Sequence, residues 1–342
     1  MKSDPVKAVA CISSGLDSML SAKIVKDLGV DVTGLHCLFR FDPVATSGRI
    51  MQVERKMADI GIPLVVRDIT FSFMDMFMNP EHGYGSEMNP CIDCRLLTLQ
   101  TARSVMEETG AEFIITGEVV GQRPMTQNKP TLFHMDRVSG LKGRILRPLS
   151  ARVLPPTIPE GKGWVNREKL YDITGRGRKR QIEMARELGI HEFSQPAGGC
   201  MLTEPAWSAR ARSLMTNLGR ESVGIEDIQL LRLGRHFWPR RGLWVIVGRD
   251  EQDNKNMEPF GKGRWRFFPV DVAGPLVLAS GIENETDIQT AARLTARYSG
   301  GKNGPALAVQ YESDAHRGAL TVEPVPESLV DAWRVQADGS NR

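Results

Sequence analysis

Three cysteines in this sequence have a spacing that suits metal binding or sulfur chemistry. Cys91 and Cys94 form a Cys-x-x-Cys pair at the start of a predicted helix, and Cys200 lies far downstream after two glycines. N–H groups at a helix start lower the pKa of a thiol, as both metal ligation and redox chemistry require. Three thiolates are one ligand short of an all-cysteine zinc site, whereas a cubane iron–sulfur cluster on three thiolates leaves one iron free for sulfide. The residues alone leave a cluster, zinc, a dithiol and a structural role open.

A second candidate site is a turn of small residues between the first predicted strand and the first predicted helix. Small residues let the backbone approach a phosphate closely, and the N–H groups and dipole of a helix start favour an anion. The turn is neither a Walker loop nor a dinucleotide Gly-x-Gly-x-x-Gly motif. A plain helix cap by Asp17 or Ser18 is the alternative. The turn consists of Ser13, Ser14, Gly15, Leu16, Asp17 and Ser18.

Positive charge is concentrated in one segment. Residues 142–180 contain eleven Lys or Arg and three Asp or Glu, although the whole chain of 342 residues has a net charge of only +3. Such a segment is a candidate contact surface for a polyanion, and a solvated charged face is the alternative.

The elements that must position these residues alternate between strands and helices. The pattern predicts an α/β fold with a doubly wound parallel sheet. Residues 150–163 are expected to form a loop, and 1–205 the first domain. A helix over 208–218 and strands within 237–270 predict a smaller α+β domain over 206–342. In the first domain the expected strands are 7–12, 30–39, 63–69 and 112–116, and the expected helices are 18–28, 49–60, 94–109, 166–170 and 178–188.

The remaining composition excludes several classes of protein. The chain has no run of about eighteen apolar residues and no secretory cleavage site, so we expect no membrane span and a cytoplasmic protein. Five cysteines, an odd number, argue against a disulfide scaffold. Cys11 and Cys37 lie in predicted strands, where burial is the default.

Two sequence blocks resemble a known superfamily. The turn over residues 13–18 is similar to the pyrophosphate loop of the ATP-pyrophosphatases (PP-loop proteins), with Ser14 where glycine is commoner. Residues 115–127, followed by 145–149 (Ile-Leu-Arg-Pro-Leu), resemble the tRNA 4-thiouridine synthases and, less closely, the tRNA 2-thiouridylases. The resemblance covers about residues 7–200. It implies a PP-loop fold and cleavage of ATP to AMP and pyrophosphate.

The resemblance also implies where ATP is held. The loop of residues 13–18 would bind the phosphates, and Asp17 would help to place Mg²⁺. Adenine would lie against the end of the second strand, contacting mainly the backbone of Leu35, His36 and Cys37. The phosphates would be faced by Gly117 and Glu118, with Gln122 and Arg123 behind them; Arg123 is also a candidate tRNA contact.

For the cysteines, a subset of tRNA thiolation enzymes combines a Cys-x-x-Cys pair with a distant third cysteine to bind a 4Fe–4S cluster. Cys91, Cys94 and Cys200 match that pattern one by one. The alternatives are a catalytic disulfide pair that receives persulfide from a carrier, and a zinc or structural site.

The same resemblance makes tRNA the expected polyanion. Residues 206–342 combine basic and aromatic residues, and the string from Val247 to Asn254 resembles the RNA-binding domain of the NFACT family; a plain structural subdomain is the alternative. The candidate phosphate contacts in the first domain are Lys142, Arg144, Arg147, Arg176, Arg178, Lys179 and Arg180.

Together these features predict an ATP-dependent tRNA sulfurtransferase. It would adenylate a uridine carbonyl and replace the oxygen with sulfur, with 4-thiouridine at position 8 favoured and 2-thiouridine as the second option. Expected partners are tRNA and sulfide or a sulfur-donor protein, with a homodimer as a possible assembly. The alternatives are a non-catalytic zinc-containing RNA-binding protein and a PP-loop ligase or amidotransferase acting on a small molecule.

Overall fold

The structure is a computed structural model that describes residues 5–13, 15–42, 46–193, 200–300, 304 and 306–336. Contacts between residues divide the chain into two units. The first holds residues 5–40 and 46–193, and the second holds the described residues from Cys200 onward together with Phe41 and Asp42. The division therefore lies a few residues before the boundary expected near residue 205, and Cys200 belongs to the second unit.

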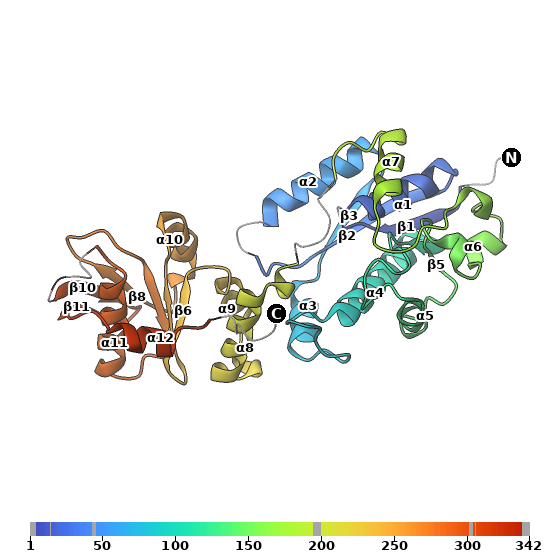
Figure 1. Cartoon of the computed structure of the whole chain (residues 1–342). Helices are drawn as coiled ribbons and strands as arrows, with labels where there is room; N and C mark the ends of the chain where they lie inside the picture. Colours follow the sequence, from blue (N-terminus) through green and yellow to red (C-terminus); the bar gives the residue numbers. More distant parts are fainter. Residues whose placement is uncertain are drawn as a thin grey trace. The chain divides into compact units, whose positions relative to one another are not determined.

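The first unit is built on a parallel sheet whose strands follow the order β3-β2-β1-β4-β5 (Figure 1). The central strand β1 pairs on both sides, so that Ala8 lies opposite Val32 of β2 and opposite Phe113 of β4. Apart from the exposed Lys7 its residues are apolar and buried, as expected for a parallel strand covered on both faces. The predicted doubly wound sheet is confirmed. The strands are β1 (Lys7–Cys11), β2 (Asp31–Leu38), β3 (Leu64–Asp68), β4 (Phe113–Ile115) and β5 (Ile145–Leu146).

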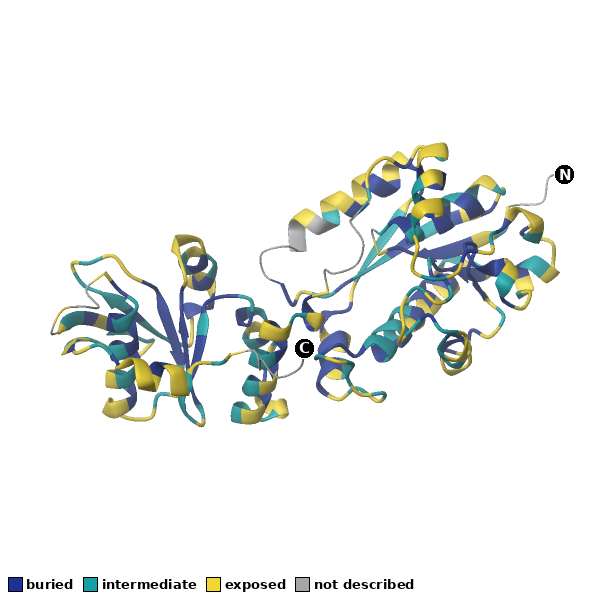
Figure 2. Ribbon diagram, in the orientation of Figure 1, coloured by how far each residue is buried: buried dark blue, intermediate teal, exposed yellow. Residues whose placement is uncertain are grey.

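Helices cover both faces of this sheet (Figure 1). One face packs against α1 (Leu16–Asp27), α2 (Thr46–Asp59) and α7 (Lys179–Glu187), and the other against α4 (Cys91–Thr109) and α5 (Lys129–Val138). Figure 2 shows that α4 is buried on one side and exposed on the other. The helix α3 (Thr70–Met78) lies between β3 and α4 in the chain.

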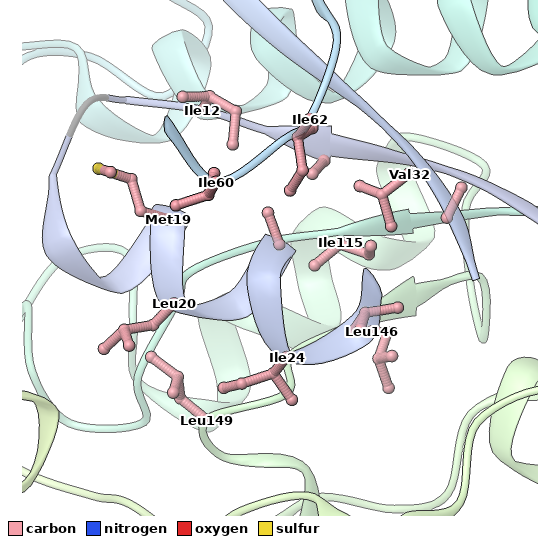
Figure 3. Packing of buried hydrophobic residues seen from close by; sticks show 14 of the residues in the cluster. Ile12, Met19, Leu20, Ile24, Val32, Ile60, Ile62, Ile115, Leu146 and Leu149 are labelled. Carbon is pink, nitrogen blue, oxygen red and sulfur yellow. The ribbon is translucent and has the colours of Figure 1, made fainter. Parts of the chain in front are cut away.

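The apolar face of α1 fixes the start of this helix against the sheet. Figure 3 shows Met19, Leu20 and Ile24 of α1 in one cluster of buried side chains that also contains Val32 and Ile115 of the strands. All five side chains are buried. A rigid helix start next to the end of β1 follows from this packing.

The structure differs from the sequence prediction in several short elements. The helices α3 and α5 were not expected. The expected loop over residues 150–163 contains a 3₁₀ helix, η1 (Ala151–Val153), and a short helix, α6 (Ile158–Gly161). The Glu160 carboxylate accepts a hydrogen bond from the Thr157 backbone N–H at 2.7 Å, which caps α6. The helix expected over 166–170 is only a 3₁₀ turn, η2 (Arg167–Lys169).

The second unit contains an antiparallel sheet in the order β11-β10-β8-β9-β7-β6. The helix α11 packs Ala291 and Leu294 against Val245 and Phe267 of this sheet. A smaller α+β domain, as predicted, is confirmed. Its strands are β6 (Arg235–Arg240), β7 (Leu243–Val247), β8 (Trp265–Pro269), β9 (Val277–Ser280), β10 (Leu307–Glu312) and β11 (Arg317–Val322). Its helices are α8 (Pro205–Leu218), α9 (Ile225–Leu230), α10 (Glu251–Met257), α11 (Glu285–Arg297) and α12 (Glu327–Trp333), with 3₁₀ turns η3 (Met201–Thr203), η4 (Arg220–Ser222) and η5 (Glu258–Gly261).

Among the described residues, no helix combines the length and the apolar character needed to cross a membrane.

Candidate active site

The turn between β1 and α1 is closed by the Ser18 hydroxyl. This oxygen accepts a hydrogen bond from the Ser13 backbone N–H at 3.2 Å and donates one to the Gly15 carbonyl at 2.8 Å. Gly15 is the N-cap of α1, and no side chain caps the helix, so the cap role considered for Asp17 or Ser18 is not what the structure has. The N–H groups of a helix's first turn have no intrahelical acceptor, which leaves them for an anion. Ser14 lies outside the described residues.

Gly117 joins the second sequence block to this turn. A Cβ atom at position 117 would lie 2.4 Å from the Ser18 backbone nitrogen and 2.6 Å from the Asp17 carbonyl carbon. Real Cβ atoms do not approach backbone atoms this closely, so only glycine fits without moving the helix start. The structure therefore brings the two blocks into one site, with the chain after β4 against the first turn of α1.

Polar groups without partners surround Asp17. Burial raises the pKa of this carboxyl, while the neighbouring amides of Gln122 and Gln181 and the charges of Arg178 and Arg123 act in the opposite direction. Within the described residues, Asp17 Oδ1, Arg178 Nε and both amide atoms of Gln181 are buried without a hydrogen-bond partner. Gln181 is fully buried. Buried polar atoms normally have partners, so this cluster is suited to a polar ligand.

The segment that supplies Arg178 and Gln181 is fixed beside Gly117 by backbone contacts. The Gly175 N–H donates to the Val120 carbonyl at 2.8 Å. The buried Ser150 hydroxyl accepts from the Val120 N–H at 3.0 Å and donates to the Ile173 carbonyl at 2.6 Å. Residues 117–123 and 173–181 thus form one wall of the site. Gln181 was missed by the sequence analysis, because a glutamine in a polar helix carries no local signal of burial.

Glu118 and Arg147 do not have the roles expected of them. Arg147 Nε lies 2.9 Å from Glu118 Oε2, and Arg147 Nη2 lies 2.6 Å from Asp136 Oδ1. Arg95 Nε is 2.9 Å from Glu118 Oε1. Only 3% of the Arg147 side chain is exposed, so the prediction that it contacts tRNA phosphates is wrong. Glu118 does not face the phosphates but holds two arginines, with Thr116 as a further donor at 3.0 Å.

This ion network keeps Glu118 ionised. Burial alone would raise the pKa of Glu118, but the charges of Arg95 and Arg147 outweigh it and lower the pKa to about 2. The network connects α4, the end of β4, α5 and the segment after β5, and Arg95 directly follows Cys94 in α4. It therefore holds the helix of the cysteine pair in a fixed position relative to Gly117.

The residues expected at adenine lie inside β2 rather than at its end. The Leu35 carbonyl already accepts from the Ile12 N–H at 2.8 Å, so the expected backbone contact is not available at that atom. His36 Nδ1 is 2.9 Å from the Ile12 carbonyl, and Cys37 is half-buried. Burial raises the pKa of the Cys37 thiol to about 12. Contacts of His36 and Cys37 with adenine stay predictions.

Cys91 and Cys94 occupy the first turn of α4. Neither cysteine forms a disulfide, both are half-buried, and the Asn89 side-chain amide donates to Cys91 Sγ at 3.1 Å. Cys200 is exposed and belongs to the second unit, so the three-cysteine site stays a prediction. Cys11 is buried, as expected for a packing role, and burial raises the pKa of its thiol.

The other basic residues divide by exposure. Arg178 is half-buried beside Asp17 rather than on the surface. Arg180 is exposed but pairs with Asp172 at 2.8 Å and lies over the Tyr171 ring. The exposed candidates for tRNA contact are Arg123, Lys142, Arg144, Arg176, Lys179 and Arg180.

Both units match family models. Residues 5–151 match the model described as thiamine biosynthesis protein (ThiI), and residues 234–334 match the NFACT protein RNA binding domain.

Curated relatives and a solved structure are also similar. The tRNA-specific 2-thiouridylase MnmA of Desulfosudis oleivorans is 28% identical over 119 residues, covering 34% of this chain and 32% of the relative. That of Methylorubrum populi is 24% identical over 265 residues, covering 71% and 65%. The chain therefore spans between about a third and two thirds of the length of these relatives. A 4-thiouridine synthetase in complex with RNA and ATP aligns with a TM-score of 0.41 and 19% identity, covering 66% of this chain and 51% of that one. By these matches residues 5–151 are similar to the ThiI family, the chain is similar to the tRNA-specific 2-thiouridylases, and residues 234–334 are similar to the NFACT RNA-binding domain.

Proposed function

We propose that the protein is an ATP-dependent tRNA sulfurtransferase that replaces a uridine carbonyl oxygen with sulfur. The resemblance of residues 115–127 and 145–149 to the tRNA 4-thiouridine synthases favours 4-thiouridine at position 8 as the product. The 2-thiouridylase relatives make 2-thiouridine the second option. The reaction takes place where tRNA is found, in the cytoplasm.

The observation that supports this proposal best is the contact between Gly117 and the start of α1, with unpartnered polar atoms around Asp17. A uracil carbonyl oxygen is a poor leaving group, and transfer of AMP to it makes AMP the leaving group. Pyrophosphate leaves with developing negative charge. The first-turn N–H groups of α1 stabilise such charge, because the helix dipole and unpaired donors point toward it.

Arg178 and Gln181 belong to this phosphate site in the proposal. The Arg178 guanidinium lies close enough to Asp17 to lower its pKa, and its Nε is buried without a partner. The sequence made Arg178 a candidate contact for tRNA phosphates. We propose instead that it binds the pyrophosphate. Gln181 offers an amide donor and an acceptor from the same wall.

Asp17 fits the role of Mg²⁺ ligand. Carboxylate oxygens are the ligands that Mg²⁺ prefers, and Mg²⁺ is usually bound by one or two carboxylates plus substrate phosphates. Asp17 Oδ1 has no hydrogen-bond partner among the described residues, and the carboxylate lies in the first turn of α1.

Cys91, Cys94 and Cys200 are the proposed ligands of a 4Fe–4S cluster. The first two fit such a role, since they form no disulfide, are half-buried and lie one helical turn apart. When bound, the cluster supplies an iron with an open position for sulfide. Sulfide or a sulfur-donor protein provides the sulfur, and a persulfide relay between the cysteines is the second option. The protein residues hold this helix start through Asn89 and the Arg95–Glu118 pair.

tRNA binds, in this proposal, through the exposed basic residues of the first unit and the second unit. Arg123, Lys142, Arg144 and Lys179 provide separated positive charges for phosphates. A homodimer is compatible with this arrangement but is not needed for it.

The test uses full-length protein prepared without oxygen and reconstituted with iron and sulfide. Incubation with unmodified tRNA, ATP and sulfide should give AMP, pyrophosphate and 4-thiouridine, identified by mass spectrometry of the nucleosides. Asp17→Asn should lower AMP formation by about a hundredfold, as expected for about 2.7 kcal/mol of lost transition-state stabilisation. Asp172→Asn, at an exposed surface ion pair, is the matched control and should keep the wild-type rate.

Two outcomes would contradict parts of this proposal. ADP and phosphate as products would contradict the PP-loop chemistry. Full iron content in Cys200→Ala would remove this cysteine from the cluster and favour the relay through Cys91 and Cys94.

A further inference from the structure

Two histidines from distant parts of the sequence meet at their ring nitrogens near the cysteine helix. His82 precedes α4 and His134 lies in α5, yet their Nε2 atoms are 3.0 Å apart. The rings are nearly perpendicular, at 77°, with centroids 5.2 Å apart. Both side chains are partly exposed. Two imidazole nitrogens this close must share either a proton or a cation, because two facing lone pairs repel.

Asp93 determines which nitrogen of His82 carries hydrogen. Its Oδ1 accepts from His82 Nδ1 at 2.8 Å, and its Oδ2 accepts from the His82 backbone N–H at 3.0 Å. Asp93 is buried, so this contact is sheltered from water. Nδ1 of His82 is thereby the donor, and its Nε2 presents a lone pair to His134. A histidine that donates to a carboxylate while its other nitrogen is free is the usual arrangement of a metal-bound histidine.

The distance and the surrounding charges suit a cation. Zinc–nitrogen bonds of about 2.0–2.1 Å in a tetrahedral site separate two nitrogens by roughly 3.3 Å. The observed 3.0 Å is within a few tenths of that value. Glu81 adds an exposed carboxylate near His82, since the ligand atoms of Glu81, His82 and Asp93 all lie within 4.8 Å of one another; this group does not include His134. The nearest opposing charge is Arg137, whose Nη2 is 3.4 Å from His134 Nδ1.

We propose that His82 and His134 bind one divalent cation of the zinc type through their Nε2 atoms. Asp93 orients His82, and water completes the coordination. The site is separate from Cys91 and Cys94 and uses no thiolate. It joins the segment before α4 to α5, and so it would stabilise the chain around the start of the cysteine helix. The inference does not depend on the proposed sulfur transfer.

The test is metal titration of the full-length chain with Cys91, Cys94 and Cys200 replaced by serine, so that no candidate thiolate of the cluster site contributes. Co²⁺ should bind with one equivalent, with an absorption spectrum typical of nitrogen and oxygen ligands, and Zn²⁺ should displace it. His134→Ala and His82→Ala should each weaken binding at least tenfold. His191→Ala, which removes an exposed histidine outside the cluster, is the matched control and should bind as the parent does.

A second measurement covers the case in which the serine variant does not fold. With all cysteines present, Zn²⁺ should raise the melting temperature of the iron-free protein more than that of its His134→Ala form, because only a ligand of the folded state stabilises it. Equal Co²⁺ affinity of parent and His134→Ala, or an equal Zn²⁺ shift in this second comparison, would overturn the proposal. The contact between the two histidines would then be only a shared proton. Arg137 donates to His134 Nδ1, so the hydrogen of that ring would lie on Nε2.

Discussion

Two buried titratable groups, one in each unit, are held in opposite charge states. The first unit buries charges: Glu118 lies between Arg95 and Arg147 beside the proposed nucleotide site. The second unit buries a neutral histidine, His236, whose Nε2 donates to the Leu233 carbonyl at 2.8 Å while Nδ1 accepts from Trp244 Nε1 at 3.2 Å. Burial lowers the pKa of His236 to about 3, whereas arginine charges hold Glu118 ionised.

The difference suggests a division of tasks. A buried ion pair contributes little net stability, because desolvation offsets the attraction, but removal of one partner is strongly destabilising. Such a network fixes geometry between α4, β4 and α5, which a site with two reacting groups needs. The hydrogen bonds of His236 fix only the turn before β6 against β7.

Glu118→Gln should have the largest effect. The substitution keeps the shape of the side chain but removes the negative charge that lies between Arg95 and Arg147. The first unit should lose about 3–5 kcal/mol of unfolding free energy, the cost of an uncompensated buried charge. Hydrogen exchange read peptide by peptide should show faster opening of β4 and α4, with the second unit unchanged.

The reference for this change is an ion pair of the same unit at the surface. Asp172 pairs with Arg152 and Arg180, and all three side chains are exposed. Asp172→Asn should leave the unfolding midpoint unchanged. Equal losses in Glu118→Gln and Asp172→Asn would contradict the structural role given to the buried network.

Gly117→Ala should have the next largest effect and should act on catalysis first. The added Cβ would meet the backbone of Asp17 and Ser18, so the start of α1 must move. A displacement of about 1 Å costs roughly a hundredfold in rate when groups must be aligned. AMP formation should fall by that factor. Gly161→Ala, where a Cβ meets nothing within 4 Å, should keep the parent rate. A parent-like rate of AMP formation in Gly117→Ala would mean that the contact between the two sequence blocks is not needed for the reaction.

The sequence predicted the parts of the site that depend on local motifs. The loop of residues 13–18 and Gly117 are adjacent to strand ends in the sequence, and in a parallel sheet such ends meet at one edge. The contact of Gly117 with Ser18 follows from that topology. Gln181 could not be found in this way, because its burial depends on how α7 packs against α1.

Arg147 shows why a count of charges in a segment does not predict which of its side chains are exposed. Eleven basic residues in one segment suggested a surface, but Arg147 is buried because Asp136 of α5 binds it. The helix α5 was not expected from the sequence, and it has Pro130 in its first turn, where proline is tolerated. The Asn128 side chain, which accepts from the Thr131 N–H at 2.9 Å, caps this helix start. His82 and His134, 52 residues apart, have no local pattern at all.

Acid should destabilise the two units in different pH ranges. His236 has a lower pKa in the folded state, about 3, than in the unfolded chain, about 6.5, so below pH 6.5 the unfolded state binds the extra proton. The second unit should therefore lose up to about 1.4 kcal/mol per pH unit below that value. Glu118 contributes stability that is present above about pH 4.5 and is lost as the pH falls toward 2.

His236→Gln is the test of that difference. Five of the six tryptophans lie in the second unit, so tryptophan fluorescence in urea follows mainly its unfolding. The parent should lose stability between pH 6.5 and 5, and the variant should lose clearly less, since glutamine does not titrate. The same slope in both proteins would mean that another group of the second unit binds the proton.

The smallest expected effect distinguishes two neighbouring basic residues of the first unit. Lys179 is exposed, and loss of one phosphate contact should flatten the slope of log affinity for tRNA against log salt by about one unit. Arg178 lies beside Asp17, so Arg178→Ala should instead lower AMP formation at saturating tRNA by at least tenfold and leave the salt slope unchanged. Lys179→Ala should show the reverse, with AMP formation at saturating tRNA kept. A flattened salt slope and a normal rate of AMP formation in Arg178→Ala would mean that this arginine contacts tRNA. The proposed pyrophosphate site around Asp17 would then need another positively charged residue.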